Sequence, residues 1–298
     1  MTDDDTHPLI LHAPAKLNLS LHVGSKREDG FHSLVTLMSR VNIYDTLEFV
    51  LREDQQLTLE ILATDGQDVS DIPCDQNNLI IQAAELLRQK SQSNWGAHIR
   101  LIKRIPSQAG MGGGSSDAAT TFMGLNRLWN LGFRQQQLQE FSAQIGSDVP
   151  YFLGQSNWAV CHGRGENVVD LDQQANLPVV IFHPGFGCST KEIFGEFQPL
   201  TPLPDLPTYL QQIQTQSVET LLQNDLQQPA VTVEPQLQPL LKSLNECCPR
   251  GAMMTGSGSA MFGLCNSYRQ STRVSSQLQQ KYSKQYPQAK VFAAQMIG

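Results

Sequence analysis

The chain has 298 residues, of which 40% are hydrophobic, so it can form one large or two medium-sized domains with a substantial core. Its formal net charge of −7 argues against a general binder of nucleic acid or anionic membranes. The six cysteines show no Cys-x-x-Cys pair and the seven histidines no His-x-x-x-His spacing, so we expect reduced thiols and no transition-metal site made by protein ligands alone.

The start of the chain and its apolar runs indicate the cellular compartment in which the protein is expected. Residues 2–6 are acidic, which is the opposite of the basic start of a signal peptide. The apolar run at residues 177–182 is far too short to span a bilayer. We therefore expect a cytoplasmic protein without a membrane, nucleic-acid or obligate protein partner.

Residues 13–23 alternate in polarity and predict the first core strand. The apolar row consists of Leu17, Leu19, Leu21 and Val23, and the polar row of Lys16, Asn18, Ser20 and His22. A solvent-facing polar row is common in antiparallel sheets, and the spacing alone favours that interpretation. Alternatively, a lysine held just inside the strand start, after the rigid Ala-Pro-Ala at residues 13–15, would reach a phosphate or orient a carboxylate.

A turn at residues 28–30 leads to Phe31 and His32. An aromatic ring next to an imidazole is compatible with ordinary core packing, but the pair is equally suited to stack on a flat base and to hydrogen-bond its edge. Further strands are predicted at residues 34–41, 46–51, 57–62 and 97–105. The last of these strands is apolar on one face except for Lys103, and it follows a polar loop at residues 64–73 and a helix capped by residues 75–78.

The most informative stretch, residues 106–119, reads Pro-Ser-Gln-Ala-Gly-Met-Gly-Gly-Gly-Ser-Ser-Asp-Ala-Ala. It joins the preceding strand to an amphipathic helix, with Ser115 or Ser116 as the expected N-cap. Such a junction presents backbone N–H groups at the positive end of a helix, and a phosphate group is the expected ligand. One or two glycines would favour a simple tight turn, but four of them within residues 110–114 favour an anion site.

This glycine loop does not match the commoner phosphate-binding templates. It lacks the Gly-Lys-Ser/Thr ending of a P-loop and the third glycine of the dinucleotide fingerprint, and neither serine lies in a Gly-x-Ser-x-Gly elbow. It resembles instead the ATP loop of the GHMP kinase superfamily, whose members phosphorylate hydroxyl groups of small molecules. The length of the loop, the glycine positions and the Ser-Ser step all agree.

Downstream of the loop, residues 135–145 predict a helix that Gly146 closes. Asp148 is the expected N-cap of the short helix that follows, and a capping carboxylate can also be a catalytic one. A strand at residues 158–164 enters a Gly-Arg-Gly turn, after which the composition changes. A second domain is therefore expected to begin near Glu166.

The C-terminal part of the chain predicts a mixture of strands and helices. Its expected elements are a buried strand at residues 177–183, a helix starting at 189–192, a proline-rich surface connection at 199–207, solvated helices in the glutamine-rich tract at 211–238, a glycine-serine loop at 251–264 and a final strand at 290–296. Backbone N–H groups of the glycine-serine loop would form a second place to hold phosphate.

Further segments continue the resemblance in the order that the family has them: residues 14–19, 29–32, 75–79, 146–150, 183–185 and 255–259. Together these segments narrow the resemblance to the GHMP kinases of the non-mevalonate isoprenoid pathway, whose acceptor is 4-diphosphocytidyl-2-C-methyl-D-erythritol. The resemblance runs from about residue 12 to about residue 264, and residues 195–250 match only weakly.

The resemblance implies an α+β fold of two domains with the active-site cleft between them. Residues 1–165 would form an ATP-binding domain of the ribosomal-S5-domain-2-like type, and residues 166–298 a ferredoxin-like α/β domain. Whether the final strand, near residues 290–298, returns to the first domain is left open.

The implied reaction moves the γ-phosphoryl group of ATP, with Mg²⁺, to the 2-hydroxyl of the acceptor. Lys16 and Asp148 are the implied catalytic residues. The lysine would neutralise developing charge and hold the aspartate, which would accept the hydroxyl proton or orient the hydroxyl. An ordinary aspartate, with a pKa of about 4, is a poor base for an alcohol, so both roles of Asp148 stay open.

The remaining site residues are implied by the matching motifs. Around ATP they are Asn78, Leu79, Lys103, Pro106, Gly110, Met111, Gly112, Gly113, Gly114, Ser115 and Ser116, with Ser115 or Ser116 also a candidate for Mg²⁺. Around the cytidine diphosphate acceptor they are Asn18, Phe31, His32, Thr190 and Phe194. Phe31 stands where many family members carry tyrosine, which keeps base stacking and removes a phenolic hydrogen bond. Core packing on a helix face is the competing interpretation of Phe194.

Two other functions compete with this one. A GHMP kinase with a mevalonate-like or homoserine-like acceptor would share the glycine loop, but Phe31, His32 and Thr190 argue against it. A nucleotide-binding module without catalysis would need neither Lys16 nor Asp148.

Overall fold

The computed structural model describes residues 7–64, 69–172, 176–199 and 201–298. Three sequence expectations fall wholly or partly outside these residues: the acidic start at residues 2–6, the middle of the polar loop at 64–73, and residue 200 of the proline-rich connection. Within the described ranges, no helix combines the length and the apolar character that a membrane crossing requires.

The chain forms two compact units, each assembled from separate segments. The first comprises Met1–Ala15, Ile43–Ile105 and Gly112–Gly154, and the second Lys16–Asn42, Pro106–Met111 and Gln155–Gly298, of which we discuss only the described residues. Two long strands, β1 (Leu9–Lys26) and β2 (His32–Arg52), run from one unit into the other. The linear division into domains 1–165 and 166–298 stays a proposal.

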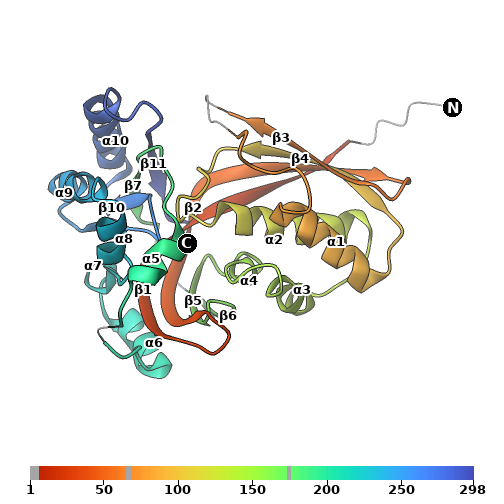
Figure 1. Ribbon diagram of the computed structural model, residues 1–298, viewed down its shortest axis with the longest axis horizontal. Coiled ribbons are helices and arrows are strands. Elements are labelled where there is room, and N and C mark those ends of the chain that lie inside the picture. Colours follow the sequence, from red (N-terminus) through yellow and green to blue (C-terminus); the bar gives the residue numbers. More distant parts are fainter. Residues whose placement is uncertain (1–6, 65–68, 173–175, 200) are drawn as a thin grey trace. The chain divides into compact units, whose positions relative to one another are not determined.

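In the first unit, helices cover a sheet in which β4 (Gly96–Lys103) has a strand on each side. This strand pairs in parallel with β3 (Leu57–Ala63) and antiparallel with the last part of β2. The helices are α1 (Leu79–Ser91), α2 (Gly113–Leu128), α3 (Gln135–Ser142) and α4 (Val149–Phe152). Figure 1 shows α1 and α2 side by side along this sheet. The predicted apolar row of β4 is buried, and so is Lys103 at its end.

A glycine allows α2 to lie close to the sheet. A Cβ atom at Gly124 would lie 2.6 Å from ring atoms of Phe49 on β2, which is far inside van der Waals contact. Because both Phe49 and the neighbouring Phe122 are fully buried, the helix is held against the sheet by apolar packing. This packing holds the second half of α2, the helix that begins where the glycine loop ends.

The second unit contains a four-stranded antiparallel sheet in the order β11-β7-β10-β9. Its strands are β7 (Pro178–His183), β9 (Ala252–Met254), β10 (Met261–Leu264) and β11 (Lys290–Gln295). Helices α9 (Leu237–Cys247) and α10 (Tyr268–Tyr282) pack on it around a core that includes Phe182 and Leu244. Residues 255–260 join β9 to β10, so the predicted glycine-serine loop is a connection between two strands of this sheet.

Other strands of the second unit pair with the parts of β1 and β2 that belong to it. Leu34 to Ser39 of β2 pair with β5 (Trp158–Gly163), and β5 pairs with β6 (Asn167–Leu171). Ser20 and Leu21 of β1 pair with β8 (Gln223–Asn224). The final strand β11 pairs with β7, while Met296 beyond it bridges to Val41 of β2.

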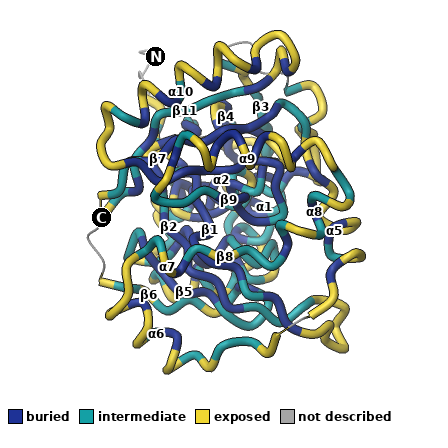
Figure 2. Tube along the Cα trace, turned by 90° about the vertical axis from the view of Figure 1, so that its left-hand side faces the viewer, coloured by how far each residue is buried: buried dark blue, intermediate teal, exposed yellow. Residues whose placement is uncertain are grey.

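The glutamine-rich tract is helical, as its spacing predicts. It forms α6 (Leu206–Thr215), α7 (Val218–Leu221) and α8 (Gln227–Val233), and the proposed helix start at residues 189–192 is α5 (Thr190–Glu196). Figure 2 shows α6 largely exposed, whereas β1 is buried along most of its length. The first of these helices is therefore solvated over most of its surface.

The solvent-facing interpretation of the polar row in β1 is wrong for three of its four residues. Lys16 is 3% exposed, Asn18 2% and Ser20 0%. Both faces of this part of the strand are covered, and Asn18 finds hydrogen-bond partners in Thr36 and Thr255. Buried polar groups of this kind need such partners, and they mark β1 as more than a structural strand.

Candidate functional site

The glycine loop, residues 106–116, belongs to both units: Pro106–Met111 lies in the second and the part from Gly112 onward in the first. Gly110 has φ 72° and Gly112 has φ 70°, a region that residues with a side chain rarely occupy. A Cβ atom at Gly110 would lie 2.2 Å from the carbonyl oxygen of Thr255. The backbone of the loop thus comes into direct contact with the connection between β9 and β10.

Helix α2 begins earlier than its serines predict. The expected N-cap at Ser115 or Ser116 is wrong: Gly112 is the N-cap residue, and both serines lie in the first turn. The reason is the left-handed conformation of Gly112, which turns the chain into the helix without a side-chain cap. The first backbone N–H groups of this 16-residue helix therefore belong to glycine and serine residues, the arrangement that suits an anion.

The two serines differ in what they can reach. Ser116 is fully buried, and its hydroxyl has no hydrogen-bond partner among the described residues. Ser115 is partly exposed at the same end of the helix. Since a ligand can contact only an accessible atom, Ser115 is the better placed of the two for a phosphate or a cation bound to phosphate.

Lys16 is attached to the glycine loop by its backbone and by its side chain. Its N–H donates to the Met111 carbonyl at 3.0 Å, and its amino group donates to the Gly110 carbonyl at 2.8 Å. The same amino group donates to Asn18 Oδ1 at 2.6 Å. The lysine is therefore held in one orientation, with its positive charge at the loop where phosphate would bind.

Asn18 connects Lys16 to the second glycine-containing connection. Its N–H donates to Thr255 Oγ1 at 2.9 Å, and its side-chain amide donates to Thr36 Oγ1 at 2.9 Å. The Ala260 N–H in turn donates to the Ala109 carbonyl at 3.1 Å, so residues 255–260 and the glycine loop are bonded directly. Sequence reasoning missed Thr36 and Thr255 as support for this arrangement, although the Thr-Gly-Ser-Gly-Ser run was a visible signal for Thr255.

All five expected acceptor-side residues lie in the second unit, and three of them, His32, Thr190 and Phe194, have aromatic or hydroxyl partners there. The His32 ring lies 5.2 Å from that of Phe194 and 5.8 Å from that of Phe197, and His32 Nδ1 is 2.9 Å from the Gly24 carbonyl oxygen. Thr190 Oγ1 is 2.8 Å from Ser257 Oγ in the β9–β10 connection. His32 and Phe194 are therefore brought together, and Thr190 joins the glycine-serine loop.

Phe31 is 49% exposed, which is unusual for so large an apolar side chain. Its only ring partner among the described contacts is the Arg164 guanidinium, whose carbon lies 5.2 Å from the ring centroid. This cation–π contact restrains the ring without covering it fully. An accessible, steadied ring of this kind is suited to stack on a planar ligand.

Asp148 occupies the N-cap position of α4 in the first unit, as the sequence predicts. Its side chain makes no capping hydrogen bond, and Pro150 follows in the first turn of the helix. The carboxylate is partly exposed. Its expected partnership with Lys16 stays a prediction, because the two residues belong to different units.

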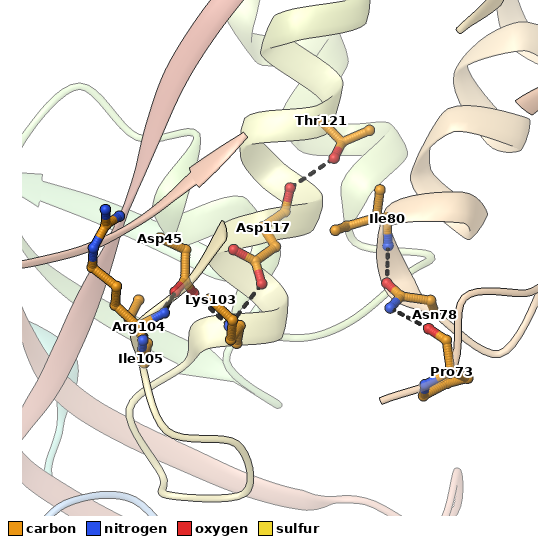
Figure 3. Close-up of polar contacts among 9 residues, drawn as sticks. All are labelled: Asp45, Pro73, Asn78, Ile80, Lys103, Arg104, Ile105, Asp117 and Thr121. Carbon is orange, nitrogen blue, oxygen red and sulfur yellow. Dashed lines mark hydrogen bonds and ion pairs between the residues drawn. The ribbon is translucent and has the colours of Figure 1, made fainter. Parts of the chain in front are cut away.

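Asn78 has a structural role in addition to the one expected. Its Oδ1 accepts from the Ile80 N–H at 2.9 Å and its Nδ2 donates to the Pro73 carbonyl at 2.7 Å, which caps α1 and fixes the preceding loop (Figure 3). Leu79 is the first residue of α1, and its Cδ1 atom lies 3.6 Å from a Cβ built on Gly114. Both residues thus border the start of α2.

Lys103 lies in a buried cluster with two carboxylates that sequence reasoning did not pair with it. Its amino group donates to Asp117 Oδ2 at 2.9 Å and, over a short contact, to Asp45 Oδ2 (Figure 3). All three residues are no more than 3% exposed. The one available signal was a lysine in an otherwise apolar row, which needs a buried partner.

The pKa values of Lys103 and Asp117 are both raised. This is notable for Asp117, because pairing with a cation by itself lowers the pKa of a carboxyl group. Burial lowers the pKa of Lys103, but attraction by Asp117 and Asp45 outweighs burial and raises it. Burial raises the pKa of Asp117 to about 8, since the attraction of Lys103 is opposed by the charge of Asp45. One ammonium group neutralises one carboxylate, and Asp45 also accepts two backbone N–H groups, so we assign the proton of the cluster to Asp117.

Comparison with known proteins identifies both parts of the chain. Residues 78–155 match the family described as GHMP kinases N terminal domain, and residues 209–284 match GHMP kinases C terminal. The 4-diphosphocytidyl-2-C-methyl-D-erythritol kinase of Brevibacillus brevis is 37% identical over 257 residues, which cover 85% of this chain and 86% of the relative. The protein of the same name from Alcanivorax borkumensis is 38% identical over 278 residues, covering 92% and 88%.

Solved structures agree with these matches. A crystal structure of 4-(cytidine 5'-diphospho)-2C-methyl-D-erythritol kinase has a TM-score of 0.76 and 31% identity, covering 97% of this chain and 100% of the other. Homoserine kinase from Cytophaga hutchinsonii has a TM-score of 0.70 at 16% identity, covering 100% of this chain and 97% of the other. At 16% identity, the similarity to homoserine kinase shows only that the two proteins share a fold.

Proposed function

The chain belongs to the 4-diphosphocytidyl-2-C-methyl-D-erythritol kinases, a family of GHMP kinases, and we propose that it transfers the γ-phosphoryl group of ATP to the 2-hydroxyl of 4-diphosphocytidyl-2-C-methyl-D-erythritol. It is an ATP-dependent kinase with an alcohol group as acceptor. The products are ADP and the 2-phosphate, in non-mevalonate isoprenoid precursor biosynthesis. We place the protein in the cytoplasm, where ATP is available.

The observation that carries the proposal is the attachment of Lys16 to the glycine loop. A loop that only closes a turn needs no buried lysine, yet Lys16 is 3% exposed and bonded to Gly110 and Asn18. An ammonium group held at a loop of backbone N–H groups stabilises negative charge that develops on a phosphoryl group in transfer. We therefore give Lys16 the role of stabilising the transferring group.

The N-terminus of α2 would bind the phosphates of ATP. Its first residues, from Gly113 to Ser115, offer backbone N–H groups that have no intrahelical acceptor, whereas the Ser116 N–H donates to the Gly112 carbonyl at 2.9 Å. Residues Pro106, Gly110, Met111 and Gly112 shape the approach to this turn, and Asn78 and Leu79 border it from α1. Phosphoryl transfer depends mainly on such positioning and on charge stabilisation.

The residues present also fit Mg²⁺ on the ATP phosphates. Mg²⁺ takes oxygen ligands and commonly keeps only one or two from the protein. The partly exposed Ser115 hydroxyl is the candidate, because Ser116 is fully buried. When bound, Mg²⁺ would act as a Lewis acid that offsets the negative charge of the phosphates.

Asp148 would orient the acceptor hydroxyl or accept its proton. It supplies a partly exposed carboxylate whose side chain is not used to cap α4. We favour orientation, because an alcohol is far less acidic than a carboxylic acid. We propose it as the partner of Lys16 in catalysis.

The acceptor side would use aromatic and hydroxyl groups of the second unit. Phe31 offers an exposed ring for the cytosine base, and His32, fixed between Gly24 and Phe194, offers an imidazole edge. Thr190 and Asn18 are both hydrogen-bonded to the β9–β10 connection, through Ser257 and Thr255, and would orient the rest of the substrate.

An acceptor screen with ATP and Mg²⁺ tests the proposal. We expect release of one ADP per molecule of the cytidine diphosphate substrate, and none above background with mevalonate or homoserine. Turnover of mevalonate or homoserine without turnover of the cytidine substrate would replace the proposed acceptor. Nucleotide binding without ADP release with any acceptor would replace the kinase by a binding module.

A further inference from the structure

The Asp45–Lys103–Asp117 cluster lies at the base of the glycine loop, where the chain enters and leaves it (Figure 3). Building on the proposed function, we propose that Lys103 is a positioning residue: together with Asp45 and Asp117 it fixes the first turn of α2 for the phosphates of ATP, and its amino group does not contact the adenosine. This replaces the role that the sequence resemblance implied for Lys103.

The cluster ties both ends of the loop to one point. On the entering side, Asp45 Oδ1 accepts from the backbone N–H groups of Arg104 at 2.6 Å and Ile105 at 2.9 Å. On the leaving side, Asp117 in α2 accepts from Lys103, which ends β4, at 2.9 Å. The residues between Ile105 and Asp117 are those of the glycine loop, so its two ends cannot separate while the cluster is intact.

The amino group of Lys103 also lies directly against the first helical residue. A Cβ atom at Gly113 would be 3.0 Å from Lys103 Nζ and 3.1 Å from Ile105 Cγ2. The helix start therefore rests on the lysine and on the end of β4, with no room for a side chain. A shift of the ammonium group would move the backbone N–H groups that are to hold phosphate.

Burial argues against direct contact between Lys103 and a base. Lys103 is 3% exposed, and its amino group donates to two carboxylates, whereas that of Lys16 donates to the neutral oxygens of Gly110 and Asn18. A ligand atom at Lys103 would have to displace a carboxylate and leave a buried charge unpaired, which is costly. The amino group of Lys103 therefore supports the loop and does not bind the adenine.

The charge of the cluster favours an anion nearby only if one carboxylate is neutral. With both carboxylates ionised the cluster would carry one negative charge within the first turns of α2, where it would oppose a triphosphate. Asp117 Oδ1 has no hydrogen-bond partner among the described residues, which disfavours its ionised form. The charged groups that face Asp117 are Lys103 from β4 and Asp45 from β2.

Binding of ligand fragments distinguishes positioning from base contact. ATP, inorganic tripolyphosphate and adenosine are titrated by competition against a fluorescent ATP analogue, in the wild-type protein and in Lys103→Met. We expect the variant to bind ATP and tripolyphosphate at least about tenfold more weakly, a loss of about 1.4 kcal/mol for each factor of ten, with unchanged affinity for adenosine. Weaker adenosine binding with unchanged tripolyphosphate binding would overturn the proposal.

Arg100→Met is the matched control. Arg100 lies on the same strand and also bridges two carboxylates, Glu48 and Glu60, but it is partly exposed and its two partners lie on β2 and β3, outside the loop. We expect no change in any of the three affinities. If Arg100→Met and Lys103→Met weaken tripolyphosphate equally, the effect is one of general structure and the positioning role is rejected.

Asp117→Ala keeps the test decisive if Lys103→Met does not fold. Removing the carboxyl group breaks the hydrogen bond between α2 and Lys103 and leaves the Lys103–Asp45 pair in place. We expect a severalfold loss of tripolyphosphate affinity with adenosine affinity unaffected, and an unchanged tripolyphosphate affinity would reject the proposal.

The titrations need no acceptor, so failure of the proposed reaction would appear separately, as missing turnover by the wild-type protein. If the wild-type protein does not bind tripolyphosphate, the proposed anion site at the start of α2 is rejected, and the positioning role with it.

Discussion

Lys16 donates from its amino group to the carbonyl oxygen of Gly110, with 2.8 Å between the two atoms across 94 residues of sequence. The backbone N–H of the same lysine donates to Met111 at 3.0 Å. The lysine therefore supplies a positive charge to the glycine loop and also fixes its backbone. These two contributions give a mutation at this position a specific expected effect.

We predict that Lys16→Met lowers kcat by about 10²–10³-fold, the usual effect of removing one group that stabilises a transition state. Steady-state kinetics with ATP and the cytidine substrate measure it. Lys26→Met is the control, because Lys26 is exposed at the far end of the same strand and should leave kcat unchanged. A Lys16→Met protein with wild-type kcat would remove the lysine from catalysis.

Asp148→Asn should leave ATP binding nearly intact and reduce turnover by at least about 10²-fold, the typical contribution of a positioned acid–base group. The amide keeps the size of the side chain but neither accepts a proton nor pairs with an ammonium group. Nucleotide titration and single-turnover kinetics separate the two effects. Unchanged turnover would exclude Asp148 from the mechanism.

Gly110→Ala should destabilise the protein by at least about 2 kcal/mol, since strain at positive φ adds to a steric clash. The added Cβ would lie 2.2 Å from the Thr255 carbonyl oxygen. Gly132 has nearly the same φ, 71°, with no atom within 4 Å of an added Cβ, so Gly132→Ala isolates the strain alone. Urea unfolding of both variants gives the comparison, and equal losses of stability would show that the contact with Thr255 is unimportant.

Much of this arrangement could be predicted from local patterns. The strand at residues 13–23, the strand–loop–helix junction and the N-cap position of Asp148 follow from spacing and turn chemistry within a few residues, and they are confirmed. The α+β GHMP kinase fold is confirmed as well. These features depend on short-range physics, which the sequence displays directly.

What local patterns could not predict depends on distant partners. Asn18 is buried because Thr255, 237 residues away, covers and bonds it, and no periodicity reveals that contact. Lys103 finds Asp45 at a separation of 58 residues. The wrong N-cap has a different cause: Gly112 adopts the left-handed conformation, and serine chemistry at Ser115 was given too much weight.

Phe31→Ala should raise the KM for the cytidine substrate by about 5–10-fold and leave the KM for ATP unchanged, because an aromatic stacking contact contributes about 0.5–1.5 kcal/mol. Phe31→Tyr should retain the wild-type KM or lower it, since the ring is kept and a hydroxyl is added. Initial rates at varied acceptor concentration measure both. A wild-type KM in the alanine variant would place the base elsewhere.

The Asp117 cluster should make stability depend on pH. Burial raises the folded-state pKa of Asp117 to about 8, above its ordinary value of 3.8, so the folded protein holds a proton that the unfolded chain releases. Its contribution to stability is complete below about pH 4, is lost as the pH rises towards about 8, and is constant above that, with a slope of at most about 1.4 kcal/mol per pH unit. Asp117→Asn should lack this slope, which urea unfolding from pH 5 to 9 will measure in both proteins. Parallel stability curves for the two would contradict the assignment.

The most direct test of the central claim is phosphorus NMR of the complete reaction: wild-type protein, ATP, Mg²⁺ and 4-diphosphocytidyl-2-C-methyl-D-erythritol. We predict one new phosphate monoester on the tertiary 2-oxygen for each ADP formed, with the diphosphate of the substrate unchanged. ADP accompanied only by inorganic phosphate, or a monoester at a different hydroxyl, would contradict the account.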